Sequence, residues 1–361
     1  MRPRTLAHID LDALRHNLQC IRAMASQSKL IAVVKANAYG HGLAGITTAL
    51  EAADCCAVAT VEEAATLRDN GWQGRLLLLQ GFADRQELEA SIELNTELVI
   101  HQQSQLDLLA ESGCKLKQKV WIKLETGMHR LGFPLEQFPA LCQQFPARQI
   151  NVMTHFASAE EDNNASVIDQ FSRFQAALNG TTYSRSMANS AAIVNYPQSH
   201  ADWVRSGLMI YGVSPLATGS GQDLGLRPVM TFSARLLAIQ TCRSGDMVGY
   251  GSTYKCSEDM QVATIAVGYG DGYPWQASSR PDRQTNVLLA GQLCPIIGRV
   301  SMDMLAIDLR PLQKLNIKVE AGDEVILWGE GLPVEDIARS IESIPYELLC
   351  GLSGRVNYRY E

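Results

Sequence analysis

Ile31-Ala-Val-Val-Lys35-Ala-Asn-Ala-Tyr39-Gly-His-Gly42 is the stretch around which the chain is organised. Its first half is short, apolar and rich in β-branched residues, which predicts a buried strand. The strand ends on Lys35, and a polar turn punctuated by glycine follows at once. An ammonium group in that position is costly unless it is neutralised or used. Lys35 therefore either reaches solvent at the strand end or forms an imine with an aldehyde cofactor, which removes the full charge from its pocket.

Strands and helices alternate after this run. Asp10 precedes a segment with helical periodicity, and Thr60 and Asp84 are each followed three residues later by glutamate, which predicts three helix starts. A further helix is expected at 165–178, and strands are expected at residues 57–59, 76–79, 98–100, 120–122 and 150–153. Alternation over about 225 residues favours parallel strands in an eight-stranded βα barrel over a small doubly wound sheet. We therefore predict a TIM-like (β/α)8 barrel over residues 1–226.

Beyond residue 226 the pattern changes to short strands separated by Gly, Pro and Asp turns. Only residues 334–341 have helical periodicity there, and strands are expected at residues 232–239, 261–267, 287–290, 304–309 and 324–328. This pattern predicts a second, mainly β domain over residues 227–361. Residues 218–223 are expected to form the loop that precedes it.

Composition excludes several classes of protein. The chain has 361 residues, which favours two domains, and its net charge of −7 without a basic patch argues against a nucleic-acid partner. No apolar run approaches the roughly 20 residues that span a bilayer, so no membrane partner is expected. Nine cysteines without C-x-x-C spacing favour free thiols over disulfides or a metal site. These features predict a soluble cytoplasmic protein without a bound metal.

Polar residues follow several of the predicted barrel strands. The active site of such a barrel lies at the carboxyl ends of the strands, and Lys35 ends the first clear one. From the fifth strand to the eighth, the residues at these ends are Arg130, His155, Asn189-Ser190 and Arg205. Each is a residue type that suits an anionic cofactor bearing a phosphate.

Residues 33–42 resemble the pyridoxal-phosphate attachment site of bacterial alanine racemases, and the resemblance extends over nearly the whole chain. It implies that Lys35 binds pyridoxal 5'-phosphate covalently. It also implies an enzyme that interconverts L-alanine and D-alanine, either to supply D-alanine for peptidoglycan synthesis or in the catabolism of alanine. Residues 187–192 and 204–208 resemble the family's phosphate motifs. By that resemblance the phosphate contacts are Tyr39, Ser190, Gly207 and Leu208.

The resemblance places Arg205 against the pyridine nitrogen of the cofactor. A guanidinium donates a hydrogen bond but keeps its proton, so the cofactor is a poorer electron sink, which suits a racemase and argues against a decarboxylase. Residues 121–132 resemble a third motif, which places Arg130 near the phenolic oxygen of the cofactor and the substrate carboxylate. Lys123 matches a position that is often carbamylated in the family, where it orients this arginine.

Racemisation needs two proton carriers on opposite faces of a planar intermediate. Lys35 is one, and by family resemblance Tyr250 in residues 247–254 is the other. A free phenol has a pKa of about 10, which is too high for an efficient base near neutral pH. His155 is expected to bind the cofactor and to be linked to Arg205, and it would stabilise the phenolate. The resemblance assigns the D-enantiomer's proton to Lys35 and the L-enantiomer's to Tyr250. Tyr254 is interpreted as a core tyrosine.

The family forms head-to-tail homodimers with shared active sites, and the resemblance implies the same here. The β domain would then enter the partner's barrel mouth. In that arrangement Met302 contacts substrate, Tyr269 and Arg299 narrow the way in, and Asp303 belongs to the same supporting segment.

Two positions depart from the family pattern. Ser186 stands where many members place a histidine beside the ring-nitrogen arginine, which leaves the support of Arg205 open. Gly354 occupies a site where an aromatic residue is common. Two other functions stay open from the sequence: a broad-specificity racemase acting on serine or lysine, and a barrel that binds pyridoxal phosphate without turnover.

Overall fold

The structure is a computed structural model that describes residues 3–114, 116–280 and 282–361. These residues form two compact units, which we call the barrel unit (residues 14–210 and 214–219) and the β unit (residues 3–13, 211–213 and 220–361). The first residues of the chain therefore belong to the β unit, although the sequence pattern groups them with the barrel.

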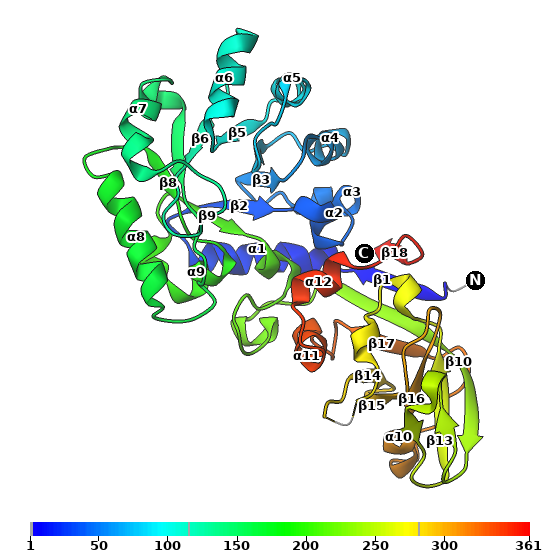
Figure 1. Cartoon of the computed structure of the whole chain (residues 1–361). Coiled ribbons are helices and arrows are strands. Elements are labelled where there is room, and N and C mark those ends of the chain that lie inside the picture. The colour runs from blue at the N-terminus through cyan, green and yellow to red at the C-terminus, as the bar shows by residue number, and fades with distance from the viewer. Residues whose placement is uncertain (1–2, 115, 281) are drawn as a thin grey trace. The chain divides into compact units, whose positions relative to one another are not determined.

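Eight parallel strands close the barrel unit in sequence order (Figure 1). The first of them pairs with both the second and the eighth, so the sheet has no free edge. The predicted TIM-like barrel is confirmed. Its strands are β2 (Lys29–Val33), β3 (Cys55–Val58), β4 (Arg75–Leu78), β5 (Glu97–Ile100), β6 (Val120–Lys123), β7 (Ile150–Met153), β8 (Ser184–Ser186) and β9 (Trp203–Ser206).

Helices alternate with these strands along the chain (Figure 1). The predicted starts are confirmed, because the side chains of Asp10, Thr60 and Asp84 each accept a hydrogen bond from a backbone N–H three residues later. Within the described ranges, no helix is long and apolar enough to cross a bilayer. The helices are α1 (Leu11–Met24), α3 (Leu43–Ile46), α4 (Val61–Asp69), α5 (Arg85–Glu93), α6 (Gln103–Ser112), α7 (Phe138–Cys142), α8 (Ala165–Ala177) and α9 (Ser190–Asn195).

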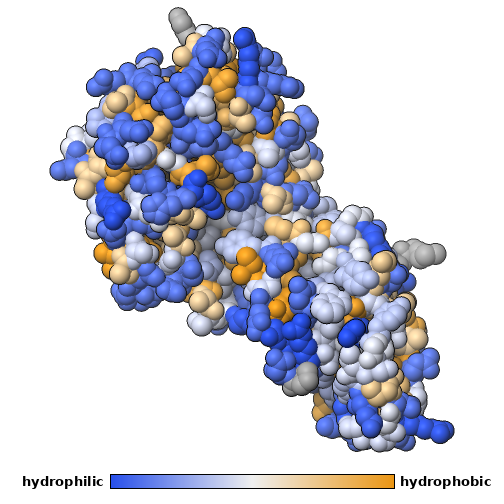
Figure 2. All heavy atoms as spheres, viewed as in Figure 1, coloured by the Kyte–Doolittle hydropathy of each residue, from blue (hydrophilic) through white to orange (hydrophobic). Residues whose placement is uncertain are grey.

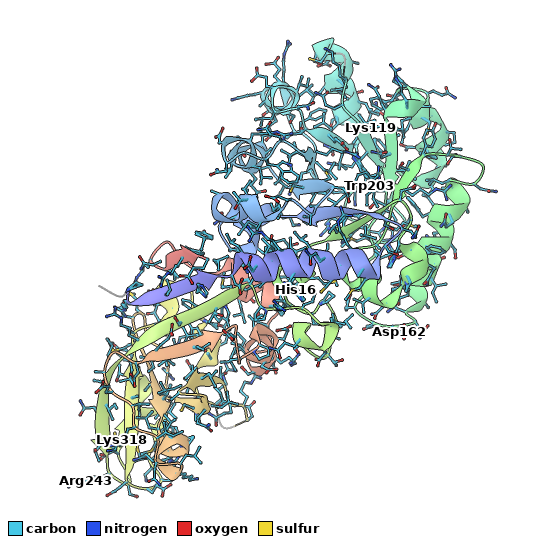
Figure 3. All side chains as sticks on the ribbon, turned by 180° about the vertical axis from the view of Figure 1, so that it is seen from behind. His16, Lys119, Asp162, Trp203, Arg243 and Lys318 are labelled. Atoms are coloured by element: carbon cyan, nitrogen blue, oxygen red, sulfur yellow. The ribbon has the colours of Figure 1, made fainter. Side chains whose placement is uncertain are left out.

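A polar network fills the barrel near the amino ends of its strands. The indole of Trp203, labelled in Figure 3, packs edge-to-face on Trp121 with ring centroids 5.8 Å apart, and the Arg75 guanidinium lies 4.3 Å from its ring. Glu97 accepts hydrogen bonds from Arg75 Nε at 2.5 Å and Nη2 at 2.9 Å, and from Trp121 Nε1 at 2.7 Å. This largely buried network fills the barrel at the amino ends of its strands. A ligand site is therefore expected at the carboxyl ends of the strands.

Replacing Glu97 with alanine is expected to lower the free energy of unfolding by about 3 kcal/mol, because Arg75 and the buried Trp121 N–H would lose their acceptor. Chemical denaturation of the variant and the wild type measures this difference. Glu89→Ala is the matched control, since its ion pair with Arg85 lies on the surface and should contribute almost nothing. Equal effects of the two substitutions would contradict the role given to Glu97.

The β unit is built around one long strand. β10 (Met230–Cys242) pairs with β1 (Thr5–Ile9), β13 (Met260–Ile265) and β17 (Glu324–Trp328). The sequence pattern does not predict β1, because its inward positions include Thr5 and Ala7 while Leu6 is only half-buried, which hides the alternation. The other strands of this sheet are β14 (Asn286–Leu289), β15 (Gln292–Ile297), β16 (Leu305–Asp308) and β18 (Asn357–Tyr360).

The five predicted strands of the β unit are confirmed, but the prediction of a single helix there is wrong. Besides α11 (Val334–Ser340), the unit contains α10 (Arg310–Lys314) and α12 (Pro345–Cys350). Both are too short for a periodic pattern, and each has proline in its first turn, which favours a helix start.

On the face shown in Figure 2, hydrophilic side chains predominate on the barrel unit and hydrophobic ones are scattered among them. All nine cysteines lie among the described residues, and the structure has them as thiols outside any disulfide.

Candidate active site

A left-handed turn follows the lysine strand. Lys35 begins α2 (Lys35–Tyr39), but residues 36–39 have φ values between 51° and 56°, in the left-handed helical region. For residues other than glycine this conformation costs about 1–2 kcal/mol per residue. Such strain persists where surrounding contacts over-determine the backbone, as happens at active sites. The predicted turn is therefore present, in a conformation that residue propensities do not predict.

Two sets of contacts hold this turn in place, one near the surface and one buried. The Glu63 carboxylate accepts a hydrogen bond from the Ala36 N–H at 2.6 Å. His41 Nδ1 lies 3.0 Å from the carbonyl oxygens of Ala38 and Tyr39. Burial lowers the pKa of His41 to about 4 against the opposing effect of these two bonds, so the imidazole is neutral and donates from Nδ1. The backbone after β2 is thus fixed, and Lys35 is fixed with it.

Arg205 on β9 is almost completely buried and surrounded by acceptors. Its Nη1 donates to Ser186 Oγ at 2.7 Å. Its Nη2 donates to the Thr154 carbonyl at 2.7 Å, the Met187 carbonyl at 3.3 Å and His155 Nδ1 at 3.1 Å. Burial lowers the pKa of Arg205 to about 10, so it stays protonated at neutral pH. The guanidinium is held rigidly while keeping its charge.

His155 lies among four positively charged side chains. Burial, and after it the charges of Arg205, Lys123, Arg130 and Lys35, lower the pKa of His155 well below its ordinary value. Its Nδ1 accepts from Arg205, so the neutral ring carries its proton on Nε2. These are residues that the sequence places at the ends of different strands, and the structure brings them together. Such a concentration of cations favours an anionic ligand.

Arg130 lies in a loop that Glu125 organises. Burial would raise the pKa of Glu125, but the backbone N–H groups of residues 127–130 bond to its carboxylate and hold the pKa below its ordinary value. Lys123, at the end of β6, is mostly buried. Burial, followed by the charges of Arg205 and Arg130, lowers the pKa of Lys123 to about 7. Near neutral pH a substantial share of Lys123 is therefore an uncharged amine.

A second group of residues converges beside the lysine turn. Ser190 Oγ accepts a hydrogen bond from the Gly207 N–H at 2.9 Å and lies 3.3 Å from Ser206 Oγ. A Cβ atom added at Gly207 would lie 2.5 Å from the Tyr39 hydroxyl oxygen. Leu208 follows directly and begins a short 3₁₀ turn. The four residues of the phosphate prediction thus lie together, and only glycine leaves room at position 207.

Tyr250 belongs to the β unit and is largely solvent-exposed, at 73%. It begins the turn between β11 (Met247–Val248) and β12 (Tyr254–Lys255), which pair with each other. Gly249 and Gly251 on either side have φ values of 74° and 71°. A Cβ at Gly251 would lie 3.1 Å from Arg299 Cζ, so the Arg299 guanidinium lies against this turn. The two glycines allow the chain to present the phenol outward.

Two further loops of the β unit are joined beside Tyr269 and Met302. Backbone hydrogen bonds of 3.1 Å and 2.9 Å connect these loops. Arg355 forms ion pairs with Asp271 at 3.3 Å and with Asp303 at 2.7 Å. Tyr269 and Met302 are both about half-exposed despite their apolar surface. The β unit therefore presents a tyrosine and a methionine on loops that are held firmly.

Known proteins match the chain throughout. The family model for the N-terminal domain of alanine racemase matches residues 9–215, and the model for its C-terminal domain matches residues 229–360. The chain belongs to the alanine racemase family. The resemblance inferred from the sequence motifs is thereby confirmed.

Curated and solved alanine racemases agree with this membership. The alanine racemase of Nitrosococcus oceani is 46% identical over 355 residues, covering 97% of each chain, and that of Shewanella loihica is 42% identical over 361 residues, covering 99% of each. The crystal structure of the biosynthetic alanine racemase from Pseudomonas aeruginosa has a TM-score of 0.93 at 40% identity, with both chains fully covered. The alanine racemase of Bartonella henselae, solved with covalently bound pyridoxal phosphate, has a TM-score of 0.88 at 28% identity, again over both whole chains.

The two departures from the alanine racemase pattern have different consequences. Ser186 Oγ accepts from Arg205 and donates to the Trp203 carbonyl at 2.9 Å, so a serine at position 186 supports the arginine in place of the histidine common there. At Gly354 an added Cβ would meet no atom within 4 Å. The missing aromatic side chain therefore leaves open space at that point of the β unit.

Two residues that shape the candidate site are not predicted as site residues from the sequence. Glu63 was expected as a capping residue of α4, and it does accept hydrogen bonds at that end, but its bond to Ala36 depends on β3 lying beside β2 in the closed barrel. For Glu125, the only sequence feature that indicates a turn it could organise is the glycine two positions later, Gly127. Neither role follows from sequence spacing, because both depend on tertiary contacts.

Proposed function

We propose that the chain is an alanine racemase that binds pyridoxal 5'-phosphate through Lys35 and interconverts L-alanine and D-alanine. The observation that carries this proposal is the cluster of cations around neutral His155, beside a strained turn that begins at Lys35. A dianionic phosphate and a substrate carboxylate are the charges that such a cluster would bind. Curated relatives named alanine racemase support the same activity.

The residues at this end of the barrel fit the cofactor. Tyr39, Ser190, Gly207 and Leu208 would hold the phosphate through hydroxyl and backbone N–H groups. Arg205 would face the ring nitrogen, donating a hydrogen bond while keeping its own proton. When bound, pyridoxal phosphate withdraws electrons from the amino acid and acidifies its α-hydrogen. Because Arg205 does not protonate the ring, that withdrawal is limited, which favours return of the proton over other reactions.

Two side chains of this protein would move the proton. Lys35 would serve the face of the D-enantiomer, and Tyr250 would serve the face of the L-enantiomer. A phenol acts as a base more readily when a neighbouring donor stabilises its phenolate. His155 supports that role, because Arg205 fixes its Nδ1 as an acceptor and leaves Nε2–H as a donor toward a phenolate oxygen.

Arg130 would bind the substrate carboxylate and the phenolic oxygen of the cofactor. Lys123 lies near it, and a protonated lysine there would repel the guanidinium. The partly neutral Lys123 amine is suited to carbamylation by carbon dioxide. A carbamate would replace the repulsion by a charge-assisted hydrogen bond and would orient Arg130.

The active enzyme is proposed to be a homodimer in which each β unit completes the partner's barrel. Tyr250, Tyr269 and Met302 are large apolar or aromatic side chains left at least 47% exposed in the single chain, which supports their burial against a second copy. Met302 would contact substrate, and Tyr269, Arg299 and Asp303 would form the surrounding wall. Such an enzyme would act in the cytoplasm and supply D-alanine for peptidoglycan synthesis.

Mixing two inactive variants tests the shared site. In a heterodimer of Lys35→Ala and Tyr250→Phe, one of the two sites would receive both wild-type side chains and the other neither. After random reassociation, about a quarter of all sites should regain activity. If Lys35 and Tyr250 of the same chain formed the site, mixing would restore nothing.

Racemisation by the holoenzyme is tested across L-amino acids with a coupled assay for each D-product. The proposal expects L-alanine to be the preferred substrate. Comparable turnover of L-serine or L-lysine would favour the broad-specificity alternative, and no turnover of any amino acid would overturn the proposal.

Gly207→Ala is expected to weaken binding of pyridoxal phosphate by about 10-fold or more, because the new Cβ would lie 2.5 Å from the Tyr39 hydroxyl and displace a phosphate contact. Titrating the apoprotein with the cofactor measures the effect. In the double variant with Tyr39→Phe the clash is partly relieved, so the combined loss should be smaller than the sum of the single losses. Strictly additive losses would contradict this packing argument.

A further inference from the structure

His101 is a buried base that the roles above do not use. It directly follows β5 and is 8% exposed. Its Nε2 lies 2.9 Å from the Gln80 carbonyl oxygen, which can only accept, so Nε2 carries the ring proton and Nδ1 has a lone pair. In the part of the chain that the structure describes, this buried Nδ1 has no hydrogen-bond partner. Buried polar atoms without a partner are rare and call for an explanation.

The barrel register places His101 beside Lys123. Ile100 on β5 pairs with Ile122 on β6, so the next residue of each strand lies at the same level. Side chains alternate along a strand, so His101 shares a barrel face with Val99, and Lys123 shares one with Trp121. Val99 and Trp121 are themselves paired. His101 and Lys123 are therefore lateral neighbours on the same face of the barrel wall.

The electrostatics agree with this placement. Burial, with the Lys123 charge as a further cause, lowers the pKa of His101 against the effect of its bond to Gln80. The pKa of Lys123 is itself about 7. Near neutral pH, an amine that is uncharged in a substantial share of the molecules thus lies beside an uncharged imidazole with an unused lone pair.

We propose that His101 is the base that receives the proton when Lys123 reacts with carbon dioxide, and that it then pairs with the carbamate as an imidazolium. This inference rests on the carbamylation included in the proposed function. The Lys123 Nζ lone pair forms a bond to the carbon of carbon dioxide, and one C=O π pair moves to oxygen. The N–H proton that is released passes to His101 Nδ1. The charges change from two neutral groups to a carbamate anion and an imidazolium cation.

The charges around Lys123 favour the carbamate and the protonated form of His101 once the carbamate has formed. A protonated Lys123 disfavours protonation of His101, but a carbamate at the same position favours it, so the modification reverses the sign of their interaction. Arg130 and Arg205 face Lys123 as cations and favour its anionic form, while Glu125 is the opposing carboxylate. Protonated Nδ1 also gains the hydrogen-bond partner that it lacks. His101 is thus a positioning residue, acting on Arg130 through Lys123.

The test uses the native enzyme in ¹³C-bicarbonate, with the carbamate carbon observed by NMR and assigned by its loss in Lys123→Ala. His101→Gln is expected to need about 10-fold more bicarbonate for the same carbamate occupancy. His200→Gln is the matched control, because His200 Nε2 also lies 2.9 Å from a backbone carbonyl in the same unit, that of Ile193. The control should match the wild type, and high bicarbonate should restore carbamate in His101→Gln.

A second measurement needs no variant that must fold. In ¹⁵N-histidine-labelled wild type, the Nδ1 resonance of His101 should move to its protonated position as bicarbonate is added. An unchanged Nδ1 while carbamate forms, or a His101→Gln variant carbamylated like the wild type, would overturn the role of His101 and leave the carbamate in place. Absence of carbamate in the wild type would overturn the whole inference. Racemase activity is assayed separately, so this outcome would not decide the proposed function.

Discussion

Lys35→Ala is expected to abolish racemisation and to remove the visible absorbance of the covalently held cofactor. The substitution deletes both the covalent attachment point and the proton carrier for one face of the substrate, so turnover should fall by about four orders of magnitude or more. The turn after β2 should survive, because Glu63 and His41 hold its backbone rather than the lysine side chain. Absorbance spectra, turnover in both directions and the thermal midpoint of unfolding measure these three expectations.

Lys29→Ala provides the control at the opposite end of β2. Lys29 begins β2, and its ammonium lies 5.2 Å from the centre of the Trp203 ring, among the residues near the amino ends of the strands. The control also removes one lysine in or next to β2 and should keep both cofactor and activity. A small primary amine added to Lys35→Ala should restore part of the proton transfer. Full activity of Lys35→Ala would end the proposed mechanism.

The barrel could be predicted because its signals are local. Helix caps at Thr60 and Asp84 are short-range patterns, and fully buried parallel strands appear as apolar runs between them. β1 could not be predicted in the same way. It is a strand because it pairs with β10 and β18, which lie more than two hundred residues away in sequence. Its own five residues do not alternate clearly enough to show which side faces inward.

The positions of the candidate site residues could be predicted more fully than their environment. The order of strands predicts Arg130, His155 and Arg205 at one end of the barrel. In the structure the two arginines lie near the neutral imidazole of His155. The sequence does not show that residues 36–39 are left-handed, because alanine and tyrosine disfavour that region. Nor does it show that Ser186 supports Arg205, since that bond crosses from β8 to β9. Both features arise from contacts that exist only once the barrel has closed.

Tyr250→Phe is expected to separate the two directions of proton transfer. Without its hydroxyl, nothing on that face can remove the α-hydrogen of L-alanine, so exchange of this hydrogen with deuterated solvent should slow by about 10²–10⁴-fold. Exchange of the D-alanine α-hydrogen through Lys35 should slow much less. Net racemisation falls in both directions because each needs both groups. NMR of the two enantiomers in deuterium oxide measures the exchange rates separately.

Tyr254→Phe tests whether position 250 is special. Tyr254 lies four residues later on β12, where its hydroxyl accepts from Arg310 Nη2 at 3.3 Å and its ring packs against buried Cys256 and Met260. Its removal should change stability slightly and neither exchange rate. The asymmetry between enantiomers is the decisive measurement, because distortion of the loop would slow both exchanges together. Unchanged exchange of L-alanine in Tyr250→Phe would remove the phenol from the mechanism and leave Lys35 without a partner on the opposite face.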